Sequence, residues 1–371
     1  MDSQNLPPWQ SAHGQLDPRS PSFYAQPQAH APLGLPQHPA QAAASRIRDL
    51  RKDMRVVSLA VLGICATVAI VQAMLMVVAF FLLLARDGLL NSYFLGTESI
   101  GNDAYIGYLS EAIGFVLLFS LPVGALWAFS LRGKKLLTSD LTRRNATPTV
   151  SAILILFALL MSVQFAVVLL QLALQPFMDL LNRSLTDSYD ETAVSAALSP
   201  LGLLYVGVVG PIIEEIVFRG GIMRRLERHG ANFAIVTSSL LFALYHMVLF
   251  QAFFAFFAGL LFAYAAGRFS LKWSVVLHMA NNLLACAQIL VIYYAPSVST
   301  AVNLAMLFLY FACFVFSLAY LATHWDKLRA QKRAGASPLS QVFSNAYRSP
   351  VFIVIVTVFV LFMLGSIMVL A

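Results

Sequence analysis

Two adjacent carboxylates and an arginine lie inside an apolar stretch of the sequence, Gly-Pro-Ile-Ile-Glu-Glu-Ile-Val-Phe-Arg-Gly at residues 210–220. If this stretch spans a membrane, each charge costs roughly 2.5–3.5 kcal/mol near the bilayer centre, so neighbouring groups must compensate for it. Glu215 and Arg219 are four residues apart on one helix face and can form an ion pair. Glu214 points about 100° away and keeps its carboxylate for other chemistry. This segment is the first candidate for a functional site.

Three further polar residues inside apolar stretches complete the candidate set. They are His246, His278 and Asn282, and Asn282 shares a helix face with His278 because it follows four residues later. Counted from the basic residues that end the apolar runs, Glu214 and His278 fall in the same half of the membrane. Alone, each group has a structural interpretation, such as a self-neutralising ion pair or an interhelical hydrogen bond. Together, ionisable groups at compatible depth indicate a functional site.

Hydrolysis is the chemistry that this set of residues could perform. Glu214 is the candidate general base toward a water molecule, while Arg219 would keep Glu215 ionised. His246 could hold the same water as a neutral imidazole. His278 and Asn282 could donate hydrogen bonds to a developing oxyanion, a contribution of about 3–4 kcal/mol for one donor. We therefore predict a site that water reaches from the cytoplasmic half of the membrane.

The elements that position these residues are predicted to be membrane-spanning helices. Of 371 residues, 59% are hydrophobic and 11% are charged, whereas a soluble protein carries about 25% charged residues. Apolar runs of about twenty residues recur, which is the length that crosses a bilayer. The fold class is therefore predicted as an all-α, polytopic transmembrane bundle of eight to nine spans. The nine spans cover, approximately, residues 56–85, 112–131, 150–174, 201–222, 231–249, 251–267, 273–294, 301–323 and 351–371.

The charges orient this bundle. A basic cluster at residues 46–55 precedes the first span and places the N-terminus in the cytoplasm, while the predicted outer linkers are rich in Asp and Glu. The formal net charge of +7 comes from clusters between apolar runs, which argues against nucleic-acid binding. Residues 231–267 would form a helix about 55 Å long, too long for one crossing, so we predict a break near Leu249–Gln251. The predicted location is an integral, multi-pass membrane protein, in the cell membrane if the source is prokaryotic.

The chain divides into three predicted regions. Residues 1–45, rich in Pro, Gln and Ala, cannot bury enough apolar surface to fold and are predicted to be a disordered cytoplasmic tail. Residues 46–323 form the predicted transmembrane bundle. Residues 324–371 form a basic inner loop and a C-terminal span. Three scattered cysteines lack any ligand spacing and are interpreted as packing residues, Cys65, Cys286 and Cys313.

The polar residues also resemble the motifs of a known family. Glu214-Glu215-x-x-x-Arg219, Phe242-x-x-x-His246 and His278-x-x-x-Asn282 are similar, in order and spacing, to the three motifs of the CAAX protease and bacteriocin-processing family (CPBP, Abi) of intramembrane endopeptidases. One motif alone is weak evidence, whereas three in order are specific. The resemblance covers the predicted protease core, residues 200–294.

The resemblance implies a membrane-embedded helical protease, and the eukaryotic members of the family remove the last three residues of prenylated CAAX proteins. It implies that Glu214 activates water with support from Glu215 and Arg219, and that His246 holds this water. It also implies that His278 and Asn282 form the oxyanion hole. The expected partners are membrane lipid and a peptide or membrane-protein substrate, prenylated or not, with no nucleic acid.

No cofactor is predicted, with zinc as the alternative because family members have been labelled metalloproteases. Two histidines and one glutamate are a known zinc ligand set. However, the sequence lacks HExxH and shows no carboxylate placed to orient ligating histidines. A metal-free glutamate mechanism therefore fits the residues better.

Two functions of other classes compete with the protease hypothesis. The first is a non-enzymatic membrane binding or immunity protein that uses the same cavity. The second is a proton-coupled transporter in which Glu and His relay protons. A transporter predicts polar groups along the whole membrane path, whereas the outer halves of these spans are apolar.

Overall fold

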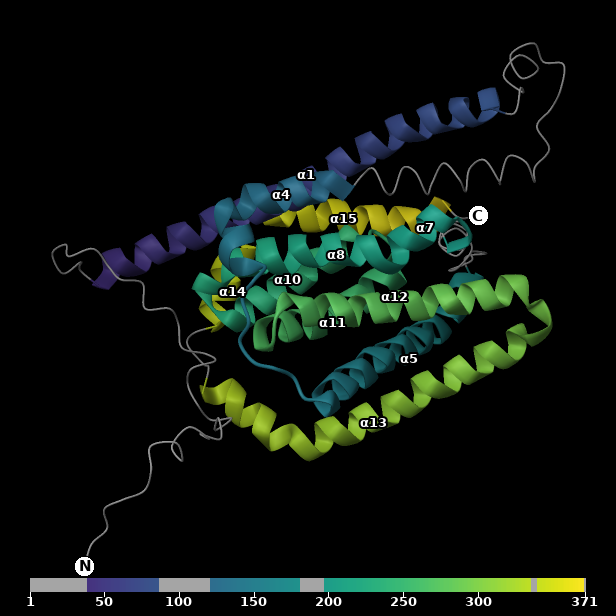
Figure 1. The fold of residues 1–371 in the computed structure, drawn as a ribbon. Helices are drawn as coiled ribbons and strands as arrows, with labels where there is room; N and C mark the ends of the chain where they lie inside the picture. The colour runs from purple at the N-terminus through teal and green to yellow at the C-terminus, as the bar shows by residue number, and fades with distance from the viewer. Residues whose placement is uncertain (1–38, 87–120, 181–196, 335–338, 370–371) are drawn as a thin grey trace, which may run out of the picture. The chain divides into compact units, whose positions relative to one another are not determined.

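The fold is helical throughout the part of the chain that the structure describes. The computed structural model describes residues 39–86, 121–180, 197–334 and 339–369. Within these ranges there is no strand, and Arg144 and Ser270 form an isolated antiparallel bridge. The predicted all-α fold class is therefore confirmed (Figure 1).

The elements follow one another closely along the chain. The α-helices are α1 (Pro39–Arg86), α4 (Leu121–Arg132), α5 (Val150–Leu180), α7 (Pro200–Leu204), α8 (Gly210–Glu215), α9 (Arg224–Leu226), α10 (Ala231–Tyr245), α11 (Leu249–Arg268), α12 (Leu271–Tyr294), α13 (Ser299–Ala334), α14 (Leu339–Tyr347) and α15 (Pro350–Val369). Wider π-helical turns form η2 (Leu136–Asp140), η3 (Tyr205–Val209) and η4 (Ile216–Met223). Tighter 3₁₀ turns form η5 (Glu227–His229) and η6 (Pro296–Val298).

Several of these helical segments are long and apolar enough to cross a membrane. Six qualify singly among the described residues, Gln41–Val78, Val150–Leu180, Pro200–His229, Leu249–Arg268, Leu271–Tyr294 and Pro296–Asp326. The pair Gln341–Tyr347 and Pro350–Gly365, bent by 73°, would add a seventh. This confirms the prediction of a multi-pass integral membrane protein. The count of eight to nine spans and the cytoplasmic N-terminus stay predictions, and part of the predicted span 112–131 lies outside the described residues.

Two boundaries of the predicted regions can be compared with the ends of helices. α1 begins at Pro39, inside the range predicted as tail, and the rest of that range lies outside the described residues. α13 continues to Ala334, so the start of the predicted basic inner loop is a helical extension of the preceding span.

Helix packing places span four, Pro200–His229, inside the bundle. α10, α11 and α12 pack against one another, and α5 lies between α11 and α13 (Figure 1). On the other side of span four, α1 packs against α4, α14 and α15. α11 buries small residues along its length, which lets neighbouring backbones approach closely, Ala255, Ala258, Gly259, Ala263 and Ala266.

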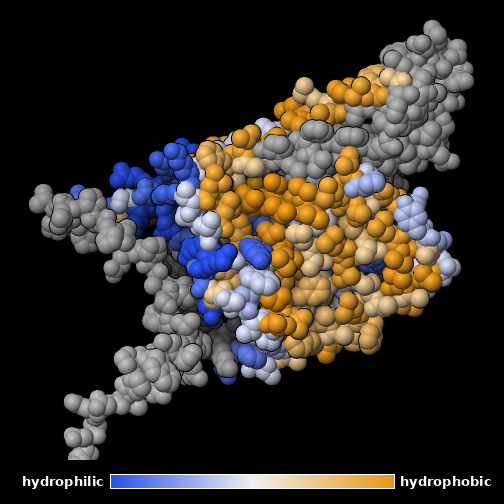
Figure 2. All heavy atoms as spheres, in the orientation of Figure 1, coloured by the Kyte–Doolittle hydropathy of each residue, from blue (hydrophilic) through white to orange (hydrophobic). Residues whose placement is uncertain are grey.

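The surface is divided between a hydrophilic end and an apolar body. In Figure 2 hydrophilic residues gather at the end of the bundle where α14 and the start of α1 lie, and most of the remaining visible surface is hydrophobic. Exposed leucines, valines and phenylalanines of α5, α13 and α15 contribute to the apolar body. Lipid can solvate such a surface, whereas the hydrophilic end suits water and headgroups.

The break between the fifth and sixth predicted spans falls at residues 246–248. α10 ends at Tyr245 and α11 begins at Leu249, close to the predicted break near Leu249–Gln251. Met247 has φ +58°, in the left-handed region that residues other than glycine seldom adopt. The turn therefore forms without the Gly or Pro that would have marked it in the sequence. As a consequence, His246 caps the end of α10 rather than lying within a continuous helix.

Candidate active site

The Glu-Glu pair lies on one short α-helical turn between two wide turns. α8 is preceded by η3 and followed by η4. Pro211 has no N–H to donate to the preceding turn, so a regular α-helix could not continue unchanged through it. Gly210 is needed at the junction, because a Cβ there would lie 3.0 Å from the carbonyl oxygen of Tyr205. π-helical turns of this kind occur often at functional sites.

Glu215 is the centre of a fully buried polar network. Its Oε1 lies 3.0 Å from Nη1 of Arg219 and 3.0 Å from Nδ1 of His278. Its Oε2 accepts a hydrogen bond from the Ser274 hydroxyl. The side chains of Glu215 and Arg219 have no exposed surface. The ion pair predicted from their spacing is present, and the same carboxylate also ties span four to α12.

Arg219 extends this network to α10 and α11. Its Nη2 donates to the carbonyl oxygen of Gly259 at 3.2 Å. Its guanidinium lies over the Phe242 ring, 4.4 Å from the centroid, and 5.5 Å from that of Phe262. A Cβ at position 259 would lie 3.1 Å from Nη2, so glycine is required for this approach. The arginine charge is thus compensated by a carboxylate, a carbonyl and two aromatic faces.

Glu214 has a different environment from its neighbour. Its side chain is 20% exposed, and its Oε2 lies 3.7 Å from Nε2 of His278. His278 also stacks on Phe262, with ring centroids 4.6 Å apart. One imidazole therefore lies between two carboxylates, with a hydrogen bond to Glu215 and a longer approach to Glu214.

His246 is held in one tautomer by the helix that it ends. Its Nδ1 lies 2.8 Å from the carbonyl oxygen of Phe242. A carbonyl oxygen only accepts, so Nδ1 carries the proton and Nε2 of the neutral imidazole is an acceptor. The Phe242 ring packs edge-on against the imidazole, with centroids 4.7 Å apart. The spacing of four residues between Phe242 and His246 therefore has a structural reason.

Asn282 is oriented by hydrogen bonds at both ends of its amide. Its Nδ2 donates to the carbonyl oxygen of Val206 at 2.9 Å, and its Oδ1 accepts from Nδ2 of Asn281 at 3.1 Å. Asn281 accepts in turn from Gln164 at 3.4 Å. Because an amide nitrogen carries two protons, one N–H of Asn282 remains for a ligand.

A cavity of about 610 Å³ connects these side chains. Four of the six predicted residues line it, Glu214, His246, His278 and Asn282. Glu215 and Arg219 do not line it and are buried behind it. Its volume is in the range of small-molecule and cofactor sites. The structure thus brings the six residues together as four facing a cavity and two supporting them.

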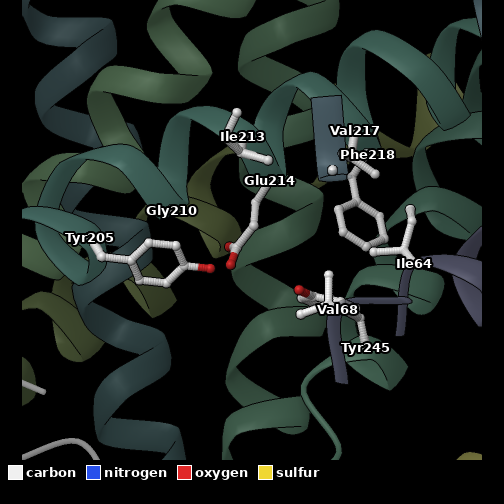
Figure 3. Close-up of a pocket in the computed structure, with 10 residues that line it drawn as sticks. Ile64, Val68, Tyr205, Gly210, Ile213, Glu214, Val217, Phe218 and Tyr245 are labelled. Carbon is white, nitrogen blue, oxygen red and sulfur yellow. The ribbon is translucent and has the colours of Figure 1, made fainter. Parts of the chain in front are cut away.

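Four site residues were not predicted from the sequence, Ser274, Asn281, Tyr205 and Tyr245. Ser274 precedes His278 by four residues, so the helical spacing that linked His278 to Asn282 could have found it. The tyrosines carried no such signal, because tyrosine is common in apolar helices. Figure 3 shows both tyrosines beside Glu214, with the Tyr205 hydroxyl pointing toward its carboxylate.

The side-chain arrangement does not fit a zinc site. Among the described residues no group of three or more His, Cys, Asp and Glu side chains could hold a metal ion. Glu215 does hold Nδ1 of His278 at 3.0 Å, as a carboxylate does for a ligating histidine, although the sequence did not reveal this contact; Nε2 faces Glu214 at 3.7 Å. We therefore derive no chemical step from a metal.

Residues 196–284 match the family model described as type II CAAX prenyl endopeptidase Rce1-like. The match includes all seven residues of the three motifs, and so all six predicted site residues. This match supports the resemblance of the chain's three motifs to the CAAX protease family. The match is to a family of membrane proteases that act on peptides or membrane proteins, and the apolar helices support an integral, multi-pass membrane location. No curated protein and no solved structure matches the chain.

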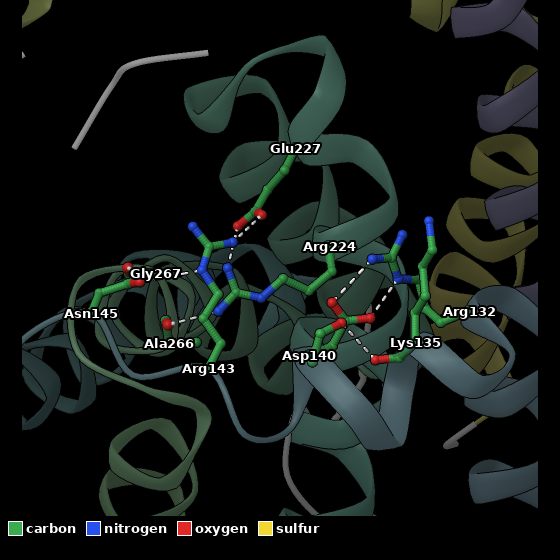
Figure 4. A network of polar contacts seen from close by, with 10 residues as sticks. Arg132, Lys135, Asp140, Arg143, Asn145, Arg224, Glu227, Ala266 and Gly267 are labelled. Carbon is green, nitrogen blue, oxygen red and sulfur yellow. Dashed lines mark hydrogen bonds and ion pairs between the residues drawn. The ribbon is translucent and has the colours of Figure 1, made fainter. Parts of the chain in front are cut away.

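The chain carries a second group of charged residues outside the cavity, which we call the end network. Arg224, only 2% exposed, contacts Glu227 at 2.5 Å and donates to the carbonyl oxygen of Ala266 at 3.0 Å. Arg143 reaches the same Glu227 at 3.0 Å (Figure 4). These contacts join the end of span four to the loop before α5 and to the end of α11.

The end network also includes a buried aspartate on α1. Asp53 has no exposed surface and contacts Arg225 at 3.1 Å, His229 at 2.8 Å and Arg228. Arg225 donates a further hydrogen bond to the carbonyl oxygen of Leu131 at 2.9 Å. The end network thus fastens span four to α1 and α4.

Proposed function

We propose that this protein is a CAAX-type glutamic endopeptidase in which Glu214 activates the attacking water. The observation that carries the proposal is the contrast between two adjacent carboxylates. Glu215 is fully buried and contacts Arg219, Ser274 and His278. Glu214 instead lines the cavity beside His278. A general base must reach water and substrate, and Glu214 meets that condition.

Charge balance supports a protonated His278 in this mechanism. An imidazolium between Glu214 and Glu215, together with Arg219, gives the four groups a net charge of zero inside an apolar body. Both imidazole nitrogens then carry protons, with Nδ1 donating to Glu215 and Nε2 directed toward the cavity. Buried charges in membrane proteins are tolerated when they pair in this way.

The proposed reaction uses each cavity residue once. Water binds between the Glu214 carboxylate and Nε2 of His246, and its oxygen attacks the scissile carbonyl carbon while Glu214 takes the proton. The oxyanion accepts hydrogen bonds from Asn282 and His278, which stabilise charge that develops in the transition state. Glu214 then returns the proton to the departing amine as the C–N bond breaks. A new carboxylic acid and a new amine result.

The proposed location of this chemistry is the cytoplasmic half of the membrane. About ten residues after Glu214, span four ends in the basic residues Arg224, Arg225 and Arg228. These arginines belong to the end network. By the positive-inside rule such clusters face the cytoplasm. The substrate would then be a cytoplasmic peptide segment held at the membrane, and a prenyl group is one means of holding it.

The test is cleavage of fluorogenic peptides, prenylated and unprenylated, by the purified full-length protein in detergent. Glu214→Gln keeps the side-chain shape and removes the base, so kcat should fall by about 10²–10⁴-fold. Asp326→Asn is the matched control, because Asp326 is exposed on α13 and its charge lies outside the cavity. That control should cleave like the parent protein.

Three outcomes would contradict the proposal. Full activity of Glu214→Gln would exclude Glu214 as the base. Activity that a chelator removes and zinc restores would replace the metal-free mechanism. Proton-coupled solute flux in vesicles that requires Glu214, without peptide cleavage, would favour the transporter.

A further inference from the structure

A second, much smaller cavity adjoins the Glu214 carboxylate. Its volume is about 20 Å³, and it is enclosed by residues of α1, α4, span four and α10. Tyr205, Glu214 and Tyr245 line both this small cavity and the large one. Glu214 therefore lies at the border between the large cavity, which has room for substrate, and the small cavity. A cavity needs about 10–15 Å³ to hold one water molecule, so the small cavity has room for one.

The polar groups of the small cavity are suited to water. Its other side chains are aliphatic or aromatic, Ile64, Val68, Ile213, Val217 and Phe218. Three polar groups remain, the Glu214 carboxylate and the hydroxyls of Tyr205 and Tyr245. The tyrosine side chains approach the carboxylate from different helices (Figure 3). A buried water requires two to four polar partners, and these three groups meet that requirement.

Both tyrosine rings are fixed by packing that does not involve their hydroxyls. The Tyr245 ring lies 5.6 Å from that of Phe218 and 5.8 Å from the His246 imidazole, centroid to centroid. The Tyr205 ring is so close to Gly210 that a Cβ there would lie 3.4 Å from it. Removing a hydroxyl should therefore leave each ring in place.

We propose that Tyr205 and Tyr245, with Glu214, bind a resident water in the small cavity, and that both tyrosines are positioning residues for Glu214. The water contacts the carboxylate from the small cavity, and the hydroxyls contact it at the border between the two cavities. They keep it oriented toward the water that it activates. The inference rests on the proposed role of Glu214 as the base.

Single substitutions of the hydroxyls test the inference. Tyr205→Phe and Tyr245→Phe should each lower kcat by about 10-fold, because small errors in the position of a catalytic group are costly. KM should change less than about twofold, since neither hydroxyl is assigned to substrate binding. Tyr310→Phe is the control, because Tyr310 is a partly buried tyrosine of α13 outside both cavities. Unchanged kcat in both site variants would overturn the inference.

Filling the small cavity separates a resident water from an empty space. Val217 lines only the small cavity, so Val217→Ile adds a methyl group there without narrowing the large one. If a water is present, the variant should lose kcat and gain no thermal stability. If the space is dry, filling it should raise the melting temperature and leave kcat unchanged, which contradicts the inference.

The Glu214→Gln result distinguishes two kinds of failure. An inactive Glu214→Gln protein combined with fully active tyrosine variants would reject the water site alone. An active Glu214→Gln protein would reject the base itself, and the positioning role with it.

Discussion

Two networks of charged residues join span four to its neighbours, and they differ in position and in what they leave accessible. The first, which we call the buried network, comprises Glu215, Arg219, Ser274, His278 and the Gly259 carbonyl. Its His278 lines a cavity of about 610 Å³, and its other members lie behind that cavity. The end network around Asp53, Arg224 and Glu227 lies outside that cavity.

The two networks differ in which charged side chains they leave accessible to the cavity or to solvent. In the buried network Glu215 and Arg219 pair with each other, and Glu214, which directly precedes Glu215 in the sequence, reaches the cavity. In the end network arginines outnumber acids, and several of its arginines are partly exposed, such as Arg228 at 54% and Arg143 at 48%. The buried network therefore supports a reactive group, whereas the end network fastens helices where water and headgroups can also solvate the charges.

The largest effect is expected when the buried network loses its arginine. Arg219→Leu leaves Glu215 without its fully buried cation, and breaking such a pair costs about 3–5 kcal/mol. Both stability in mixed micelles and peptide cleavage should fall, because Glu215 also holds His278. An unfolding titration that compares the variant with the parent protein measures the first effect. Normal stability would show that the pair does not hold this part of the bundle together.

The pair itself illustrates what the sequence alone can predict. Residues four apart on a helix share a face, so the contact between Glu215 and Arg219 followed from spacing. The apolar runs likewise predicted the helices, and the break after the fifth span was placed within a few residues. Local geometry along a single helix determines all of these features.

Contacts between helices could not be predicted from residue spacing along a single helix. The position of His278 between two carboxylates depends on how α12 packs against span four, and no periodicity encodes it. The amide of Asn282 was predicted to be an oxyanion donor, but its bond to the Val206 carbonyl depends on the π-helical turn η3. The left-handed Met247 has no sequence signature, because the surrounding fold imposes it. The motif order was informative only through family resemblance.

A smaller effect is expected from the end network when its buried acid is neutralised. Asp53→Asn keeps the shape of the side chain and removes the charge that Arg225, Arg228 and His229 share. Hydrogen bonds to a charged group contribute about 1.5–3 kcal/mol, so stability should fall by about 2 kcal/mol. Cleavage per folded molecule should be unchanged, because Asp53 lies outside the cavity. The same unfolding titration and a peptide assay measure both quantities.

The effect of Asp53→Asn on kcat tests whether the two networks differ in function. If Asp53→Asn lowered kcat as strongly as Arg219→Leu does, the end network would control the site and would not be only a fastening.

A still smaller effect is expected from Ser274. Ser274→Ala removes the single hydroxyl proton that faces both the Glu215 carboxylate and the Phe262 carbonyl. The carboxylate keeps Arg219 and His278, so the loss should be about 1 kcal/mol. kcat should fall only a few-fold, measured beside Ser317→Ala, a buried serine of α13 outside the cavity. Equal kcat in the two variants would show that Ser274 does not help Glu215 to hold His278 in place.

The smallest effect is expected from Arg143, one of the partly exposed arginines of the end network. Its ion pair with Glu227 is 3.0 Å long, yet the arginine side chain is 48% exposed. Exposed pairs contribute about 0–1 kcal/mol and weaken with salt because mobile ions screen them. Arg143→Ala should therefore shift stability by less than about 1 kcal/mol, and the shift should shrink further at high salt. A loss as large as that of Asp53→Asn, unchanged by salt, would show that burial of the partner rather than exposure of the arginine sets the strength of this network.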